Sequence, residues 1–121
     1  MSARRRDAGQ ATVEFALTLP IVIIVALGLL QVGIAIRNEL AVELAAREGA
    51  RAAAVSTDPG GAASAAARRA VALPIGVAAT EGGGTVTVTV TYIDPTDVAI
   101  IGRFIGPSTH TATITMAIEP P

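Results

Sequence analysis

The alternation of hydrophobic and polar residues divides the chain into three successive patterns. From Phe15 to Ile36 it reads FALTLPIVIIVALGLLQVGIAI, with no charged residue. Residues 37–55 are good helix formers in which charged and small residues fall on different helical faces. Residues 85–93 and 109–119 alternate strictly between polar and apolar side chains. These patterns predict one long helix followed by two half-buried strands.

The uncharged run is long enough to cross a membrane. Its 22 residues extend about 33 Å as a helix, compared with a hydrocarbon core of ~30 Å. Arg4, Arg5 and Arg6 precede it and predict a cytoplasmic N-terminus with an extracytoplasmic C-terminal part. A cleaved signal peptide is disfavoured, because its apolar region is shorter and ends in a loop, whereas helix formers follow here. An uncleaved single-span anchor remains a candidate.

The helix beyond the run has two contrasting faces. Glu43 and Arg47 stand four residues apart on the charged face, a favourable pair. The opposite face carries a ladder of small residues that allows another backbone to approach closely: Ala41, Ala45 and Gly49. This candidate helix-packing face has two predicted partners that do not exclude each other, the chain's own C-terminal part and a helix of another subunit.

The C-terminal part predicts a small mixed structure. Residues 58–61, DPGG, form a turn or helix breaker, and residues 62–73 form a short second helix that Pro74 ends. A third strand near residues 75–79 is only weakly indicated. Since a lone hairpin is marginal in water, its apolar face should cover the long helix or the second helix. The predicted fold class is α+β: a long N-terminal transmembrane-to-extracytoplasmic helix, a short second helix, and a small antiparallel hairpin or sheet packed on the helix.

Two connections in the C-terminal part have distinct compositions. Glu81 with the three glycines 82–84 is predicted to be a flexible loop. Residues 94–107 are too long for a tight turn, and Thr96 or Asp97 could cap a short helix through Ile105. The segment is unusually apolar for a loop. It is predicted to be either a lid on the small core, which we favour slightly, or an element that docks on a partner or a membrane surface.

Composition excludes several kinds of function. The formal net charge of −1 argues against nucleic-acid binding, and the absence of cysteine excludes disulfides and thiolate metal sites. The single histidine, His110, has no second histidine or cysteine with which to share a metal and is predicted to be a sheet-face residue. Asp94, Asp97 and Glu81 would bind a cation only if the fold brought them together. No catalytic constellation, metal, cofactor or small-molecule substrate is predicted, so the protein is not expected to be an enzyme.

Glu14 requires an explanation, because it stands directly against the apolar run. A carboxylate at a membrane edge is costly and is usually paired. If the chain were cut between Gly9 and Gln10, Gln10 would carry a new α-amino group. Glu14 would then lie at i, i+4 from that amine within one helix, or could meet the amine of a neighbouring, staggered helix. Either pairing would neutralise the carboxylate, and the second would also set the register between subunits.

The residues around Glu14 resemble a known processing site. RRRDAG, then QATVEF, then the apolar run is similar to the N-terminus of class IV prepilins. VEFALTLP and AAREGARAAA are similar to the TadE-like family of minor pilins of the tight-adherence (Tad/Flp) pilus machinery. The Glu14-Phe15 pair fits this family better than the Glu-Tyr pair of the major Flp pilins.

The resemblance implies cleavage after Gly9 by a prepilin peptidase and a structural role for the mature chain. The expected partners are this peptidase, other pilins or pseudopilins, the Tad assembly platform and the lipid bilayer, without nucleic acid. The implied location is the cytoplasmic membrane, single-pass, with a pilus at the cell surface as a further destination. The runner-up is an uncleaved single-pass protein whose small extracytoplasmic domain binds another protein. The expected parts are a basic leader (1–9), a transmembrane helix (10–36), its extracytoplasmic extension (37–57) and a small α+β part (58–121).

Overall fold

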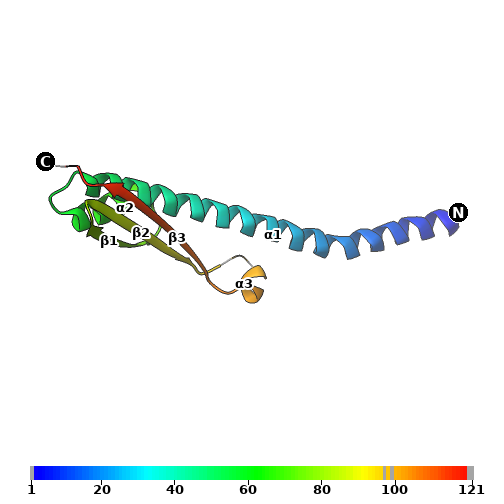
Figure 1. The fold of residues 1–121 in the computed structure, drawn as a ribbon. Helices are drawn as coiled ribbons and strands as arrows, with labels where there is room; N and C mark the ends of the chain where they lie inside the picture. The colour runs from blue at the N-terminus through cyan, green and yellow to red at the C-terminus, as the bar shows by residue number, and fades with distance from the viewer. Residues whose placement is uncertain (1, 97, 99, 120–121) are drawn as a thin grey trace. The chain divides into compact units, whose positions relative to one another are not determined.

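The computed structural model describes residues 2–96, 98 and 100–119. It confirms the α+β fold class, with a long apolar N-terminal helix, a short second helix and an antiparallel sheet. The elements in chain order are α1 (Ser2–Ala54), α2 (Pro59–Ala70), β1 (Gly76–Gly82), β2 (Thr85–Asp94), α3 (Ile101–Phe104) and β3 (Ser108–Ala117) (Figure 1).

The chain divides into two compact units. The first consists of residues 1–33 and 96–106, and the second of residues 34–95 and 107–121. The first unit therefore contains most of the apolar run together with the connection between β2 and β3. The second contains the last part of α1, α2 and the sheet.

Helix α1 begins before the predicted processing site. The basic residues and Gly9 are already helical, and the helix continues through Pro20. Proline lacks the N–H that would bond the carbonyl of Ala16, so one hydrogen bond of the helical ladder is missing there. Thr12 and Thr18 donate their hydroxyls to the carbonyls of Ala8 and Glu14, at 2.9 and 2.7 Å.

Helix α2 starts and ends earlier than the sequence suggested. The predicted breaker is its first turn, because Pro59 suits the start of a helix and the Asp58 carboxylate accepts a hydrogen bond from the Gly61 N–H at 3.3 Å. The helix ends at Ala70, before Pro74, with Val71 in an extended conformation. The prediction of residues 62–73 was therefore wrong at both ends, since it gave Asp58 no capping role.

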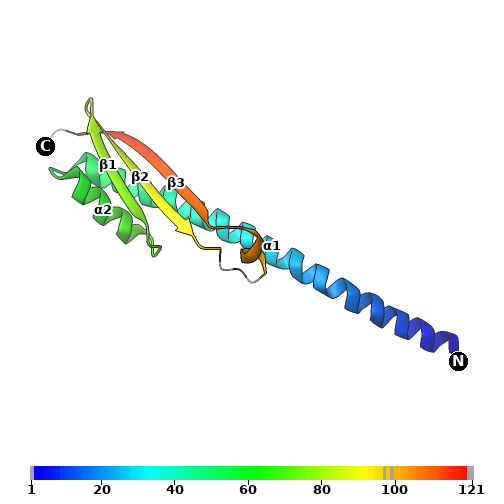
Figure 2. The same ribbon diagram turned by 90° about the horizontal axis from the view of Figure 1, so that it is seen from below.

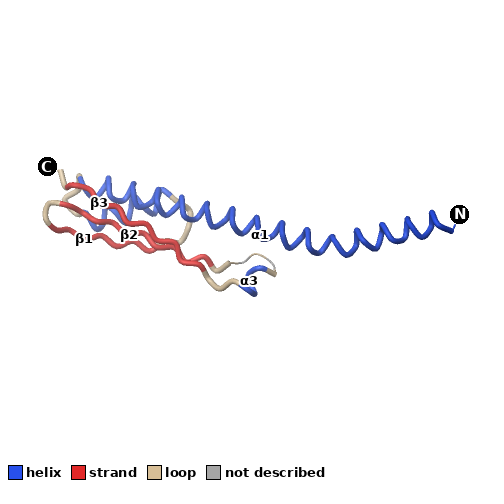
Figure 3. Tube along the Cα trace, turned by 45° about the vertical axis from the view of Figure 1, so that its right-hand side comes forward, coloured by secondary structure: helices blue, strands red, loops and turns tan. Residues whose placement is uncertain are grey.

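The sheet is antiparallel, in the order β1-β2-β3. The weakly indicated third strand is real and longer than predicted, because Glu81 and Gly82 belong to β1. The predicted flexible loop is therefore only the two-residue turn Gly83-Gly84, whose φ angles of 61° and 78° are ones that glycine adopts without strain. Figure 3 shows the three strands side by side.

The second unit has two layers. The part of α1 from residue 34 onwards and α2 cover one face of the sheet (Figure 2). The β2 valines predicted to face one side are fully buried against small residues of both helices: Val86, Val88 and Val90 meet Val42, Ala45, Ala46, Ala63 and Ala67. The opposite face carries threonines that pair across strands, with hydroxyl distances of 2.9 Å for Thr87–Thr115 and 3.3 Å for Thr89–Thr113. The alternating pattern therefore predicted both faces correctly.

Candidate functional site

The predicted processing and assembly residues lie in the N-terminal part of α1. Gly9, Gln10, Glu14 and Phe15 are all exposed. A Cβ placed at Gly9 would meet no atom within 4 Å. The bond after Gly9 lies inside the helix, beyond the first four residues, whose N–H groups have no helical partner.

Gln10 and Glu14 share one side of this helix. Residues four apart are neighbours on a helical surface, so the nitrogen of Gln10 lies one turn below the Glu14 side chain. None of the described side chains forms an ion pair with Glu14. Within the part of the chain that the structure describes, the exposed carboxylate has no cationic partner.

From residue 15 to residue 26, the apolar run that follows exposes its side chains on every side of the helix. Leu17, Ile21, Val22 and Leu29 are each 54–68% exposed. Within the described residues, α1 is the one helix whose length and apolar character would allow it to cross a membrane. Exposed side chains of this kind all round a helix suit a lipid surrounding.

The small-residue face lies against α2 and the sheet of the same chain. Ala45 and Gly49 are buried, and Ala41 is half-buried. A Cβ at Gly49 would lie 3.1 Å from the carbonyl oxygen of Ala63 and 3.2 Å from a methyl of Val88. The close backbone approach predicted from the ladder therefore occurs here with α2 and the sheet. On the charged face, Glu43 and Arg47 form the predicted i, i+4 pair at 3.8 Å.

A pair of polar contacts that the sequence did not reveal joins α1 to the ends of β2 and β3. Asn38 donates to the Asp94 carboxylate at 2.9 Å, and Nδ1 of His110 lies 3.0 Å from a carboxylate oxygen of Glu39. Asn38, Asp94 and His110 are all buried. We call these four residues the polar clasp.

The sequence does not predict the polar clasp, because its contacts join residues that are far apart along the chain. His110 lies on the apolar side of the sheet, as predicted, with its ring stacked 6.4 Å from that of Tyr92. The helical pattern places Glu39 on a solvated face, and nothing local marks it as a histidine partner. The sequence gives two hints of a buried polar contact: Asn38 comes just after the apolar run, and Asp94 stands at the end of a strand. Only the folded chain brings these two side chains together.

The structure separates the groups considered for a cation. Glu81 lies at one end of the sheet, opposite Val86, and Asp94 at the other, opposite Ser108. Asp94 follows Val86 by eight positions along β2, about 26 Å at 3.3 Å per residue. Asp97, the third candidate, lies outside the described residues. Among the described residues no three histidine, aspartate or glutamate side chains come together in a metal-binding group.

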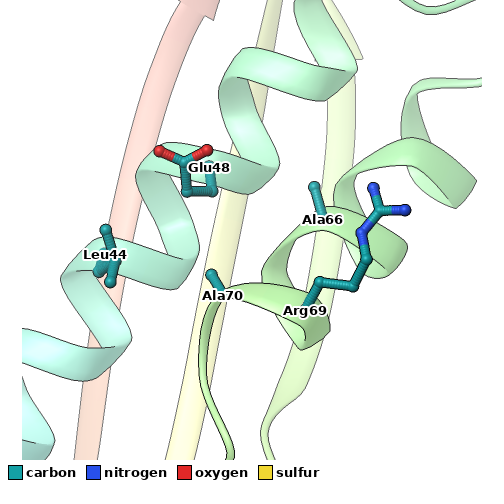
Figure 4. Close-up of a pocket in the computed structure, with 5 residues that line it drawn as sticks. All are labelled: Leu44, Glu48, Ala66, Arg69 and Ala70. Carbon is teal, nitrogen blue, oxygen red and sulfur yellow. The ribbon is translucent and has the colours of Figure 1, made fainter.

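An open groove lies between α1 and α2, with a volume of about 370 Å³. Figure 4 shows its lining: Leu44 and Glu48 from α1, and Ala66, Arg69 and Ala70 from α2. Its floor is apolar and its two walls carry opposite charges. It contains no serine, histidine or aspartate that would suggest covalent chemistry.

Residues 9–51 match the family model of TadE-like proteins. The TadE-like segment covers roughly a third of the chain and lies wholly within α1. It is the family that the VEFALTLP and AAREGARAAA motifs resemble. No curated protein and no solved structure matches the chain.

The matched residues span the features of α1 described above. It begins at Gly9, contains Glu14 and the apolar run, and ends at Arg51 after the small-residue ladder. The sheet and α2 lie outside it. The TadE-like segment therefore contains both the apolar part of α1 and the face of α1 on which α2 and the sheet pack.

Proposed function

We propose that the protein is a minor pilin or pseudopilin of a Tad-type pilus, inserted in the membrane by α1 and cleaved after Gly9 by a prepilin peptidase. Its role is structural: it takes part in assembling a pilus used for adherence or secretion. The observation that carries the proposal is the family match, which begins at Gly9 and includes Glu14 at the edge of the apolar run. The N-terminus would face the cytoplasm, in line with Arg4–Arg6.

Cleavage gives Glu14 its partner. It removes the three arginines of the leader and creates an ammonium group on Gln10, one helical turn from Glu14. The carboxylate then pairs with this amine or with the amine of another subunit. A charged side chain costs about 2.5–3.5 kcal/mol at the bilayer centre and less near the interface. Pairing with an ammonium group would lower this cost for Glu14. Pairing between subunits would also fix their axial register.

The first test is the intact mass of the membrane-extracted protein from cells with and without a prepilin peptidase. We expect loss of residues 1–9 only when the peptidase is present, and no loss in a Gly9→Leu variant. Because a side chain at Gly9 meets no neighbour, this substitution should block recognition without disturbing the fold. Gly28→Leu is the control, since a Cβ there would also meet no atom within 4 Å and the position lies far from the cut.

Glu14 is tested in the same cells. The Glu14→Gln variant should be cleaved normally but should be lost from the sheared surface fraction, whereas Glu14→Asp should retain part of its assembly. A full-length mass in both strains would contradict processing and leave the uncleaved anchor. Normal assembly of Glu14→Gln would contradict charge pairing while leaving cleavage intact.

A further inference from the structure

The groove between α1 and α2 leaves apolar surface in contact with solvent. Leu44 of α1 is 46% exposed, although it stands beyond the uncharged run. Ala66 and Ala70 of α2 are half-buried and complete the apolar floor. Figure 4 shows Leu44 on one side of the groove and the two alanines on the other. A large apolar side chain therefore lies next to two small ones on an uncovered surface.

The residues that line this groove all belong to the second unit. The connection between β2 and β3 was predicted to be a lid on the small core. That prediction is wrong, because residues 96–106 group with residues 1–33 and not with the sheet and α2. The groove is therefore open to a partner.

The two charged residues of the groove differ from their neighbour Arg68. Arg68 donates to the Ser64 hydroxyl at 3.2 Å and to the Ile75 carbonyl at 2.8 Å. Within the described part of the chain, neither Arg69 nor Glu48 forms an ion pair or a side-chain hydrogen bond. Their side chains do not point toward each other (Figure 4). Both charges can therefore meet groups of opposite charge on a partner.

The opposite charges make the groove complementary to a second copy of itself. In an isologous contact both copies use the same surface, so each pair of unlike residues meets twice. When α1 of one copy faces α2 of the other, Glu48 meets Arg69 of the second copy, and the reverse pair forms as well. Leu44 then packs on Ala66 and Ala70 of the second copy, as a ridge fits a groove.

This symmetry agrees with the insertion of α1 proposed above. Two copies in one membrane have α1 helices that point in the same direction. A two-fold axis parallel to α1 keeps this direction and leaves every residue at its own height. Leu44 and Ala70 lie at similar heights, because they line opposite sides of one groove. They therefore still meet across the two-fold axis.

We propose that this groove binds the same groove of a second copy of the chain, giving a dimer with two-fold symmetry. Helices α1 and α2 of both copies then lie between the two sheets, since these helices cover one face of each sheet. The contact requires neither cleavage after Gly9 nor entry into a pilus, so it goes beyond the proposed function. Because charges pair at its edges, the contact should weaken at high salt.

The absence of cysteine from the chain allows cross-linking of chosen positions. Leu44→Cys is introduced into full-length chains with one tag and Ala70→Cys into full-length chains with another, and the two are mixed in detergent micelles and oxidised. We expect a disulfide between differently tagged chains. Leu44→Cys mixed with Thr113→Cys, on the exposed face of the sheet, is the control and should give none.

Charge reversal distinguishes a contact between copies from one within a chain. Glu48→Arg and Arg69→Glu each bring like charges together twice in the dimer. Each should weaken dimerisation about tenfold, because two surface ion pairs are replaced by two repulsions. A mixture of the two single variants brings opposite charges together again and should restore association. Glu81→Arg, at an exposed position of β1, changes the net charge as Glu48→Arg does and should have no effect.

Dimerisation of these variants is measured by energy transfer between chains labelled at their N-termini. Chains that stay monomeric, or single variants that associate as the unchanged chain does, would overturn the proposal. Failure of the mixture to restore association would overturn it too, because the charges would then act within one chain or on a different protein. Equal cross-linking to Thr113→Cys would show random collision in the micelle and have the same consequence. None of these results depends on the peptidase, so this proposal and the proposed function can fail separately.

Discussion

The contact between Gly49 and Val88 offers a quantitative test of how closely α1 approaches the sheet. In the Gly49→Ala variant, the new methyl would lie 3.1 Å from the Ala63 carbonyl oxygen, 3.2 Å from Val88 Cγ1 and 3.5 Å from Ala67 Cβ. The first two distances are shorter than the ~3.5–4.0 Å of a favourable carbon contact. Alanine at position 49 should therefore crowd both neighbours.

Two opposing terms set the size of the effect. Replacing glycine by alanine inside a helix favours folding by about 1 kcal/mol, whereas overpacking costs about 1–3 kcal/mol. We expect Gly49→Ala to lower the free energy of unfolding by about 1 kcal/mol. Val88→Ala removes two buried methyl equivalents and should cost about 2–3 kcal/mol once the cavity is included. In the double variant the new methyl occupies part of that cavity, so the combined cost should fall short of the sum by about 1 kcal/mol.

The assay is amide hydrogen exchange of β2 in the full-length chain in detergent micelles, which gives the free energy of opening of the sheet. Gly60→Ala is the matched control, because its Cβ would meet nothing within 4 Å and should leave the sheet unchanged. Two results would refute the argument. One is a stabilising effect of about 1 kcal/mol for Gly49→Ala, the full helix-propensity gain. The other is strict additivity of the two substitutions.

Three further substitutions test separate features of the second unit. Asn38→Leu should destabilise the sheet by about 1–3 kcal/mol, because the buried Asp94 carboxylate loses a hydrogen bond; unchanged exchange at the end of β2 would contradict this. Gly84→Val should cost about 1–2 kcal/mol or more, since φ is 78° there, and Gly82→Val is its control, because the φ of Gly82 is not positive and its Cβ would meet nothing within 4 Å; equal thermal midpoints for the two variants would show that the turn is not strained. Asp58→Ala should weaken α2 by about 1 kcal/mol through loss of its cap, seen as faster exchange in the first turn of α2, whereas Ser64→Ala should leave that turn unaffected.

Periodic features of the fold were predictable from the sequence. The alternation in β2 and β3 predicted strands with a valine face and a threonine face, because a period of two places successive side chains on opposite sides. The apolar run and the small-residue ladder likewise predicted one long helix with a closely packed face. The VEFALTLP and AAREGARAAA motifs indicated the TadE-like family, because they are local runs of sequence that need no tertiary contact to be recognised.

Features that depend on one capping residue or on distant pairs were not predictable. The predicted start of α2 lies three residues late, because Asp58-Pro59 is as typical of a breaker as of the cap and first residue of a helix. The polar clasp joins residues 56 and 71 positions apart, and no local pattern links them. The grouping of residues 96–106 with residues 1–33 likewise depends on tertiary packing.

The attachment of the sheet to α1 has a mechanical consequence. One attachment is the polar clasp at Asn38 and Glu39, and the other is the hydrogen bond from the Glu119 N–H to the Ala54 carbonyl, 2.9 Å long. Between them α1 rises by about 22 Å, at 1.5 Å per residue. A tensile force along α1 would therefore load both attachments and the valine–alanine interface in shear, all at the same time. Contacts loaded together resist pulling better than contacts that open one after another, so a chain pulled along the axis of α1 would keep its sheet folded while the force passes through the helix.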